Sequence, residues 1–273
     1  PIDKIKIVFY GAGASNTTIA RLILKDGAAP DRVVIFDSHG GLHRNRKDIE
    51  ADPRFYHKWE LCKQTNPDCI DDVAEAVKGA DVLIALSKPG PDTVKPEWVR
   101  SMTSKSIVFA CANPVPEIYP YAAKQAGAYI VATGRGDFPN QVNNSIGFPG
   151  VLKGALIVRA KKITDGMAIA AAHAVAKSAE INGIHPDYIM PTMEETQVFI
   201  DEAAATAMQA VKEGVARRAL TEKEVRAQAE ADILESRNLI HHMMEEGFIK
   251  KPPLSMIQEC VEFTVAKLKN RKK

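Results

Sequence analysis

The residue pattern with the clearest chemical meaning is a glycine-containing turn near the amino end, Gly11-Ala12-Gly13-Ala14-Ser15-Asn16. It follows an apolar run that ends at Tyr10 and precedes a helical pattern over residues 17–24. In such a strand–turn–helix unit, the first glycine permits the tight turn and the second lets backbone amides approach a pyrophosphate. The amino end of the helix adds free N–H donors and a partial positive charge. We therefore predict a dinucleotide phosphate site at Gly11, Gly13, Ala14, Ser15 and Asn16.

The third glycine of this pattern is replaced by Asn16, so the close packing that glycine allows between helix and strand must relax. A tight turn without a ligand is the alternative interpretation. A second apolar run ends at Asp37, where an acid that binds ribose hydroxyls is expected. This carboxylate would repel a 2′-phosphate, whereas His43, Arg44 and Arg46 would hold one if their loop folded back. The sequence therefore predicts NAD as the cofactor and leaves NADP open.

Two further polar segments follow predicted strands, at the edge where open α/β sheets bind ligands. Ser87 and Lys88 follow the apolar run at 82–86, and their loop suits contact with the nicotinamide ribose, although a plain turn would look the same. Asn113 follows the run at 107–110, and the proline after it disfavours helical geometry and holds it extended. Asn-Pro pairs also occur in ordinary turns, so this feature alone does not assign a function.

A third polar segment, residues 134–144, contains six amide or charged side chains in a short loop before a predicted helix. Asn and Gln side chains donate hydrogen bonds to a carboxylate or hydroxyl without bringing a charge into a buried cleft. A helix that starts at Asn143 and Asn144 would add backbone donors for the same anion. The segment therefore indicates a site for a small anionic substrate.

The elements that would position these side chains change character along the chain. Up to about residue 135, short apolar runs alternate with helical patterns, which indicates right-handed βαβ units. The predicted strands cover residues 5–10, 33–36, 82–86, 107–110 and 129–131. We expect an α/β fold, a doubly wound and mostly parallel Rossmann-type sheet, with a dinucleotide-binding domain over residues 1–150.

After about residue 140, alanine-rich helical periodicity replaces the strand pattern. Capping boxes, in which a hydroxyl and an acid or amide three residues later satisfy two amides at a helix start, support these helices. They are Thr192 with Glu195, Thr221 with Glu224, and Ser255 with Gln258. Residues 151–273 are therefore predicted to form an all-helical C-terminal segment that packs on the first domain and on partner subunits, with a solvent-facing helix or arm at 220–237.

Composition excludes several classes of partner. The 273 residues are 45% hydrophobic and 26% charged, and the formal net charge of +2 creates no overall field that favours nucleic acid or an anionic membrane. The four cysteines form no CxxC pair, which suggests a reducing compartment. No apolar stretch approaches the ~18 residues of a membrane span. We expect a cytoplasmic protein that binds neither nucleic acid nor membrane.

The turn at Gly11–Asn16, together with four later segments, resembles the small prokaryotic malic enzymes as far as about Arg218. Those segments are Asp37-Ser38-His39-Gly40, Ser87-Lys88-Pro89-Gly90, Ala112-Asn113-Pro114, and the run from residue 134 through Gly147-Phe148-Pro149-Gly150. The resemblance implies that Asn113 and Asn144 hold malate near the nicotinamide. It implies further that Ser87 and Lys88 line the nicotinamide side of the cofactor site. It also implies that Asn113 and Asn143 contact the cofactor and that the protein forms a homo-oligomer, a dimer in that family.

Malic enzymes oxidise malate by hydride transfer and decarboxylate the product to pyruvate and CO₂, with a divalent metal, a lysine base and a tyrosine acid. In the family these groups lie upstream of the dinucleotide fold, so no catalytic or metal-binding residue is assigned here. The resemblance implies that Mg or Mn is bound in the complete enzyme by a missing N-terminal domain or a separate subunit. Pro1 fits removal of an initiator methionine and slightly favours a separate subunit, but a domain boundary would look similar. A non-catalytic regulatory or assembly subunit that binds a dinucleotide is the alternative.

Overall fold

The computed structural model describes residues 1–250 and 252–270, and the chain divides into two compact units, Pro1–Arg226 and Ala227–Lys273. The first unit contains the sheet and helices α1–α9. The second unit contains most of α10 (Glu222–Glu245) and α11 (Leu254–Asn270). This division does not test the predicted boundary between two domains at residue 150, which stays a prediction.

The sheet has six strands in the order β3-β2-β1-β4-β5-β6, and every pair is parallel except β2 with β3. The strands are β1 (Ile7–Tyr10), β2 (Val33–Asp37), β3 (Gly40–Gly41), β4 (Val82–Ala85), β5 (Ile107–Ala110) and β6 (Ile130–Thr133). The predicted α/β class and mostly parallel sheet are confirmed. The prediction missed β3, because two glycines carry no apolar signal, and it wrongly extended β4 to Leu86, which already belongs to the turn beside Gly11.

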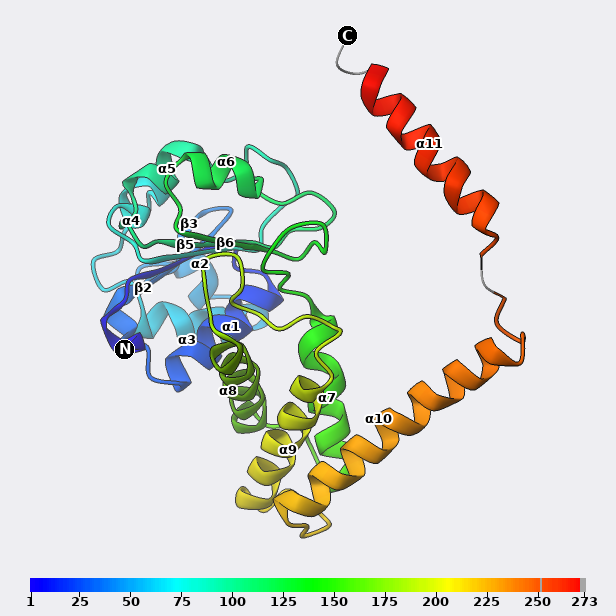
Figure 1. The fold of residues 1–273 in the computed structure, drawn as a ribbon. Helices are drawn as coiled ribbons and strands as arrows, with labels where there is room; N and C mark the ends of the chain where they lie inside the picture. Colours follow the sequence, from blue (N-terminus) through cyan, green and yellow to red (C-terminus); the bar gives the residue numbers. More distant parts are fainter. Residues whose placement is uncertain (251, 271–273) are drawn as a thin grey trace. The chain divides into compact units, whose positions relative to one another are not determined.

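Alternate residues of β1, β2, β4 and β5 enter two hydrophobic cores, one on each face of the sheet. Ile7 and Phe9 pack in the core covered by α1 (Ala14–Lys25) and α3 (Tyr56–Gln64). Val8 and Leu83 pack in the other core. The second core is covered by α4 (Val73–Val77), α5 (Pro96–Ser101) and α6 (Pro120–Gln125), which Figure 1 shows on the opposite side of the sheet. Burial on both faces explains why the strand sequences are apolar without alternation.

Short helices fill several of the connections between these elements. They are α2 (Lys47–Glu50) and the 3₁₀ turns Ile2–Lys4, Pro30–Arg32 and Pro53–Phe55. Proline begins two of the 3₁₀ turns, where its missing N–H has no helical partner to lose.

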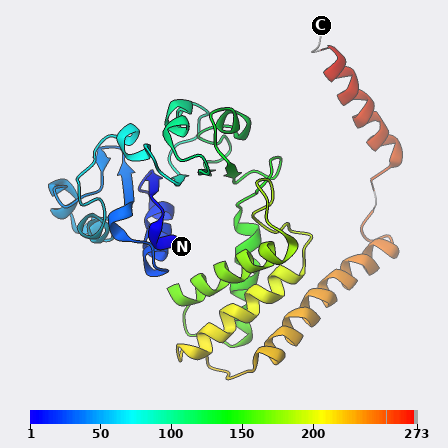
Figure 2. The same cartoon turned by 60° about the vertical axis from the view of Figure 1, so that its left-hand side comes forward.

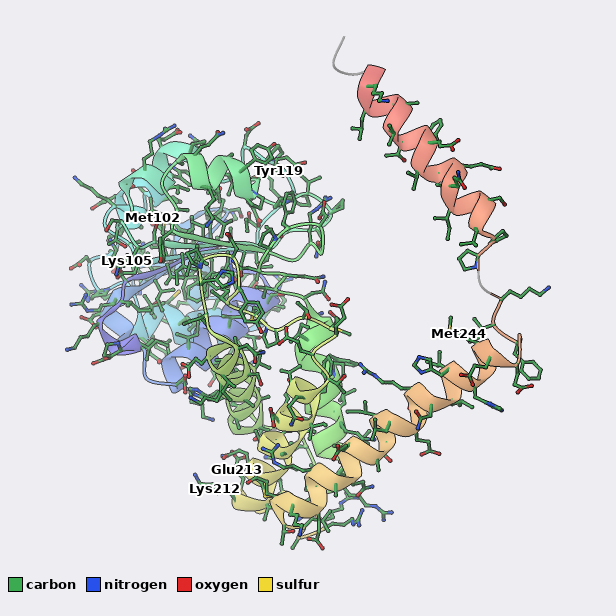
Figure 3. All side chains as sticks on the ribbon, in the orientation of Figure 1. Met102, Lys105, Tyr119, Lys212, Glu213 and Met244 are labelled. Atoms are coloured by element: carbon green, nitrogen blue, oxygen red, sulfur yellow. The ribbon has the colours of Figure 1, made fainter. Side chains whose placement is uncertain are left out.

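Three longer helices, α7 (Asn144–Ile157), α8 (Asp165–Asn182) and α9 (Gln197–Lys212), pack side by side after the sheet (Figure 2). α7 approaches α9 through glycine: a Cβ added at Gly154 would lie 2.8 Å from Thr206 Cβ. Thr164 caps α8 and also donates to Glu213, which lies at the end of α9 (Figure 3), over 2.5 Å. Small side chains and this cap therefore hold the helices in close contact.

The observed starts of α7, α9, α10 and α11 can be compared with the predicted helix starts and capping boxes. Asn143 caps α7, since its Oδ1 accepts from Ser145 N over 3.1 Å, and this confirms the helix start expected there. The box of Thr221 and Glu224 is confirmed at the start of α10. The other two predicted boxes are wrong as helix starts. α9 begins at Gln197, so the bond from Thr192 N to Glu195 closes a turn before it; α11 begins at Leu254, so Ser255 lies inside its first turn.

The predicted solvent-facing helix at 220–237 is confirmed as the first part of α10, which is mostly exposed apart from buried Val225 and Ala229. In α11 the apolar side chains Leu254, Val261 and Phe263 are exposed in the chain as it stands. Within the described residues, no helix is both long enough and apolar enough to cross a membrane.

Candidate dinucleotide-binding site

The carboxyl ends of the parallel strands meet at one edge of the sheet. The register places Tyr10 beside Phe36 on one side and Ala85 on the other, so β1 is flanked by β2 and β4. After β1 the chain crosses to one face of the sheet, and after β4 it crosses to the other face. A crevice therefore opens between these two connections. A cleft of 510 Å³ lies here, and five of the predicted site residues line it: Gly11, Gly13, Asp37, Ser87 and Lys88.

The two glycines of the turn have different physical requirements. Gly11 has φ +102°, and an added Cβ would press on the Leu86 carbonyl and lie 3.1 Å from Ser87 Cα, so the fold itself requires glycine. Gly13 is the N-cap of α1 at φ −74° and ψ −179°, a conformation open to any residue. A Cβ there would meet no atom of the described residues within 4 Å. The fold leaves this space open directly before the free amides of α1.

Asn16, at the third glycine position, is fully buried. Its Nδ2 donates to the carbonyl oxygen of Gly11 at 2.8 Å and reaches that of Ile84 at 3.4 Å. The side chain therefore ties the helix start to the turn and to β4, so the relaxed packing expected from losing glycine is offset by these bonds. Of the residues predicted to contact the phosphate from the first turn of α1, Ala14 and Ser15 are exposed, whereas Asn16 is buried.

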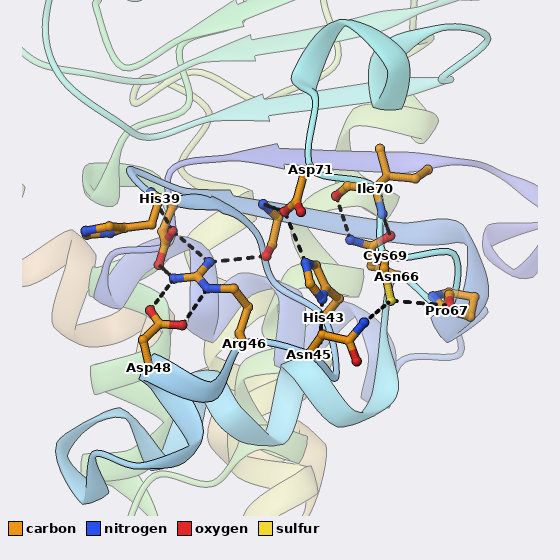
Figure 4. Close-up of polar contacts among 12 residues, drawn as sticks. His39, His43, Asn45, Arg46, Asp48, Asn66, Pro67, Cys69, Ile70 and Asp71 are labelled. Carbon is orange, nitrogen blue, oxygen red and sulfur yellow. Dashed lines mark hydrogen bonds and ion pairs between the residues drawn. The ribbon is translucent and has the colours of Figure 1, made fainter.

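Asp37 ends β2 at the other side of the cleft, and its side chain is only 9% exposed. Arg46 donates to both of its oxygens over 3.0 and 3.2 Å, and to Asp48 as well (Figure 4). Lys58 Nζ lies 3.5 Å from Asp37 Oδ2. Burial raises the pKa of Asp37, but the Arg46 and His39 hydrogen bonds and the nearby cations outweigh it and lower that pKa below its ordinary value. The carboxylate is therefore ionised and fixed in orientation.

The other basic residues considered for a 2′-phosphate are not equivalent. His43 is buried, with its ring Nε2 3.1 Å from Asp71, and Arg44 is exposed. Arg46 is buried beside Asp37 and is committed to two carboxylates, Asp48 and Asp37, which raise its pKa. Lys58, which lines the cleft from α3, was missed from the sequence. No local pattern marks it, since only the packing of α3 on the sheet brings it beside Asp37.

Two of the predicted amides, Asn113 and Asn143, lie near Gly134, which follows β6. The carboxamide of exposed Asn113 would lie 3.4 Å from a Cβ at Gly134, and Asn143 Nδ2 donates to the Gly134 carbonyl over 3.1 Å. Asn144, the first residue of α7, is exposed. Asn143 and Asn144 line a second hollow of 640 Å³, distinct from the cleft at Gly11. The structure thus brings Asn113 and Asn143 to the same glycine, and Asn144 follows Asn143 directly in the chain.

Several other polar side chains of the 134–144 loop serve its own structure. Arg135 pairs with Asp137 and donates to the Pro114 carbonyl over 2.8 Å. Buried Asn140 donates to the Val131 and Pro186 carbonyls over 3.0 and 2.8 Å. The density of polar residues, interpreted as a sign of ligand binding, is therefore explained in part by the hydrogen bonds that hold the loop to neighbouring segments.

Metal-ligating residues do not cluster in the described part of the chain. No group of three or more His, Cys, Asp or Glu side chains in residues 1–250 and 252–270 is arranged to hold an ion. The residues present therefore do not fit a complete divalent-metal site, and no step through a metal is derived for this chain.

A 3-2-1-4-5-6 strand order with a glycine turn at its centre defines the doubly wound fold of dinucleotide-binding domains. Residues 1–215 match the family model described as "Malic enzyme, NAD binding domain". The chain belongs to this family, and the resemblance found in the sequence is confirmed.

Known relatives extend this result. The "Bifunctional malic/malolactic enzyme" of Bacillus subtilis (strain 168) is 40% identical over 225 residues, which cover 82% of this chain and 53% of that protein. The "NADP-dependent malic enzyme" of Halomonas elongata is 36% identical over 232 residues, covering 80% and 53%. The crystal structure of Entamoeba histolytica malic enzyme is 58% identical with a TM-score of 0.94, covering 98% of this chain and 55% of that one. The chain thus spans about half the length of these relatives.

Proposed function

We propose that this chain is the nicotinamide dinucleotide-binding part of a malic enzyme that converts malate to pyruvate and CO₂. The observation that carries the proposal is the open space at Gly13, at the start of α1 and inside the 510 Å³ cleft that Asp37 borders. A pyrophosphate there would accept from the amides of Ala14, Ser15 and Asn16, which the helix leaves without intrahelical partners. Asp37 would accept hydrogen bonds from the adenosine ribose. The bound dinucleotide would supply hydride acceptance.

The substrate side of the proposal rests on Asn113 and Asn144. Both are exposed amides in segments that meet at Gly134, and Asn144 begins α7, where backbone donors favour a carboxylate. These uncharged groups bind and orient malate but supply neither a proton acceptor nor a cation. We propose that a complementing domain or subunit carries the Mg or Mn ligands and the acid and base residues, and that the assembled protein is a cytoplasmic homo-oligomer.

The experiment has two stages. Calorimetric titration of the chain with NAD⁺ is expected to show one site per chain, and the absence of uptake of either nicotinamide dinucleotide would overturn the proposal. Adding a malic enzyme amino-terminal domain with Mn²⁺ is then expected to give malate-dependent NADH formation. Asn113→Ala and Asn144→Ala should abolish this turnover and leave NAD⁺ binding intact. If no amino-terminal partner ever restores turnover, a non-catalytic dinucleotide-binding subunit is the better description.

NAD is the proposed cofactor, because the fixed negative charge of Asp37 opposes a 2′-phosphate. The Asp37→Ser variant removes the negative charge and leaves Lys58 at the cleft with Arg46 behind it, so the NADP⁺ to NAD⁺ affinity ratio is expected to rise at least about tenfold. Adding Lys58→Gln should reverse much of this gain. Competing titrations at matched salt measure the ratio.

The exposed Asp31, outside the cleft, provides a charge-matched control in Asp31→Ser, which should leave the ratio unchanged. A tenfold preference of the unaltered chain for NADP⁺ would refute the NAD assignment. An unchanged ratio in Asp37→Ser would show that Asp37 does not discriminate between the cofactors.

A further inference from the structure

A carboxylate that the sequence did not single out lies behind the cleft. Glu117 follows β5 in the segment leading to α6, and its side chain is fully buried. Oε1 accepts from the backbone N–H of Ser87 over 2.8 Å and from its hydroxyl over 3.3 Å. Oε2 accepts from the backbone N–H of Ala112 over 3.0 Å. One side chain thus joins the loop after β4 to the loop after β5.

The backbone of the same residue strengthens this link. The carbonyl of Glu117 accepts from Val94 N over 2.9 Å, so both the side chain and the main chain hold the segment between β4 and α5. Burying a carboxylate is costly unless its oxygens accept hydrogen bonds. The donors shown for Glu117 are neutral backbone and hydroxyl groups that converge on both oxygens. These hydrogen bonds offset part of the cost of burial.

The two loops joined in this way carry proposed ligand contacts. Ser87 and Lys88 line the cleft, and Ala112 precedes Asn113. In the strand order, β4 and β5 lie on the opposite side of β1 from β2 and Asp37. The Glu117 link therefore lies on the side away from the adenosine ribose contact, where the nicotinamide half of a dinucleotide would extend.

We propose that Glu117 is a positioning residue: its carboxylate holds the Ser87 loop and the Asn113 loop in register as one wall that receives the nicotinamide half of the dinucleotide. It acts through Ser87 and Ala112 and touches no ligand itself. The inference rests on the proposed function and deepens it, because it assigns the geometry of one half of the site to a single buried side chain.

Glu117→Gln tests the proposal with a nearly isosteric change. Two backbone N–H groups face the two oxygens, and a glutamine offers one acceptor and one NH₂, so one of these amides would then oppose a donor. NAD⁺ contains the nicotinamide half and ADP does not, so their affinities separate the two halves of the site. NAD⁺ affinity is expected to fall about tenfold or more, while ADP affinity stays within about twofold.

Matched measurements keep the outcomes distinct. Glu97→Gln removes an exposed carboxylate on neighbouring α5 and should leave both affinities unchanged. If the unaltered chain binds neither ADP nor NAD⁺, the proposed function fails. If the unaltered chain binds both ligands, the positioning role is refuted by either of two results for Glu117→Gln. One is an unchanged affinity for both NAD⁺ and ADP, and the other is an equal loss of affinity for both.

A second test needs no variant and covers the case in which Glu117→Gln does not fold. In the unaltered chain, the amide protons of Ser87 and Ala112 are expected to exchange with solvent at least about a hundredfold more slowly than that of exposed Lys88. Exchange of the Ser87 amide as fast as that of Lys88 would show that the link does not hold the loop, and would overturn the proposal.

Discussion

Replacing Gly13 with serine is expected to weaken NAD⁺ binding at least about thirtyfold while leaving the fold equally or slightly more stable. The N-cap backbone of Gly13, at φ −74° and ψ −179°, suits serine, and the new side chain enters open space. Its hydroxyl would accept from the amide of Ser15 or Asn16, so it would cap the helix and occupy the donors proposed for the pyrophosphate. Calorimetric titration and thermal unfolding of the same preparation measure both effects.

Gly11→Ala is the matched comparison, because the neighbouring glycine is required by the fold. At φ +102° and against the Leu86 carbonyl, alanine should cost about 2 kcal/mol or more of unfolding free energy. Opposite signs of the stability change in the two variants are therefore expected. Gly13→Ser that binds NAD⁺ as tightly as the unaltered chain would place the pyrophosphate elsewhere.

The second large effect concerns Glu202, a buried acid in α9 that faces α7. It is 1% exposed, and a Cβ added at Gly150 would lie 2.6 Å from its carboxyl carbon, so glycine makes room for it. Burial raises the pKa of Glu202 from 4.5 to about 8, with a partly opposing hydrogen bond from the Gly150 backbone. The folded chain therefore holds this proton more tightly than the unfolded chain does, and Glu202 is neutral at pH 7.

The sign of the pH dependence follows from that difference. The contribution of Glu202 to stability is fully present below pH 4.5 and is lost as the pH rises through about 8. Glu202→Gln stays neutral, so its unfolding free energy should match that of the unaltered chain near pH 4.5. By pH 8.5 it should exceed that of the unaltered chain by roughly 4 kcal/mol.

Urea unfolding of both proteins across this range measures the difference directly, because other titrating groups cancel in the comparison. A gap between Glu202→Gln and the unaltered chain that stays constant from pH 4.5 to 8.5 would contradict a protonated Glu202.

The parts of the fold that depend on local sequence could be predicted from it. Uninterrupted apolar strands require burial on both faces, so the runs at 33–36 and 107–110 led directly to a parallel sheet. Gly11 and Gly13 could be placed at its edge because a tight turn between strand and helix has few solutions. Asn143 was recognised as a helix start, since a side-chain acceptor there satisfies an amide that the helix cannot.

The parts that depend on distant segments could not be predicted. Lys58 reaches Asp37 only because α3 packs on the sheet, and Glu117 reaches Ser87 only because β4 and β5 are neighbours. Asn16 looked like a departure from the glycine pattern, yet its amide binds carbonyl oxygens from both sides of the turn. Thr192 and Glu195 had the spacing of a capping box, but the same hydrogen bond also closes an ordinary turn. Spacing alone does not distinguish these cases.

The two hydrogen bonds from Arg46 to Asp37 affect the entropy of cofactor binding. The carboxylate of Asp37 is already immobilised in the chain without ligand. Binding of the adenosine ribose therefore costs little side-chain conformational entropy at Asp37. Removing these hydrogen bonds with Arg46→Met would leave the acid held by only the His39 amide and Lys58, so its side chain would become more mobile. Adenosine-containing ligands should then bind with a less favourable entropy, even where the contacts finally made are the same.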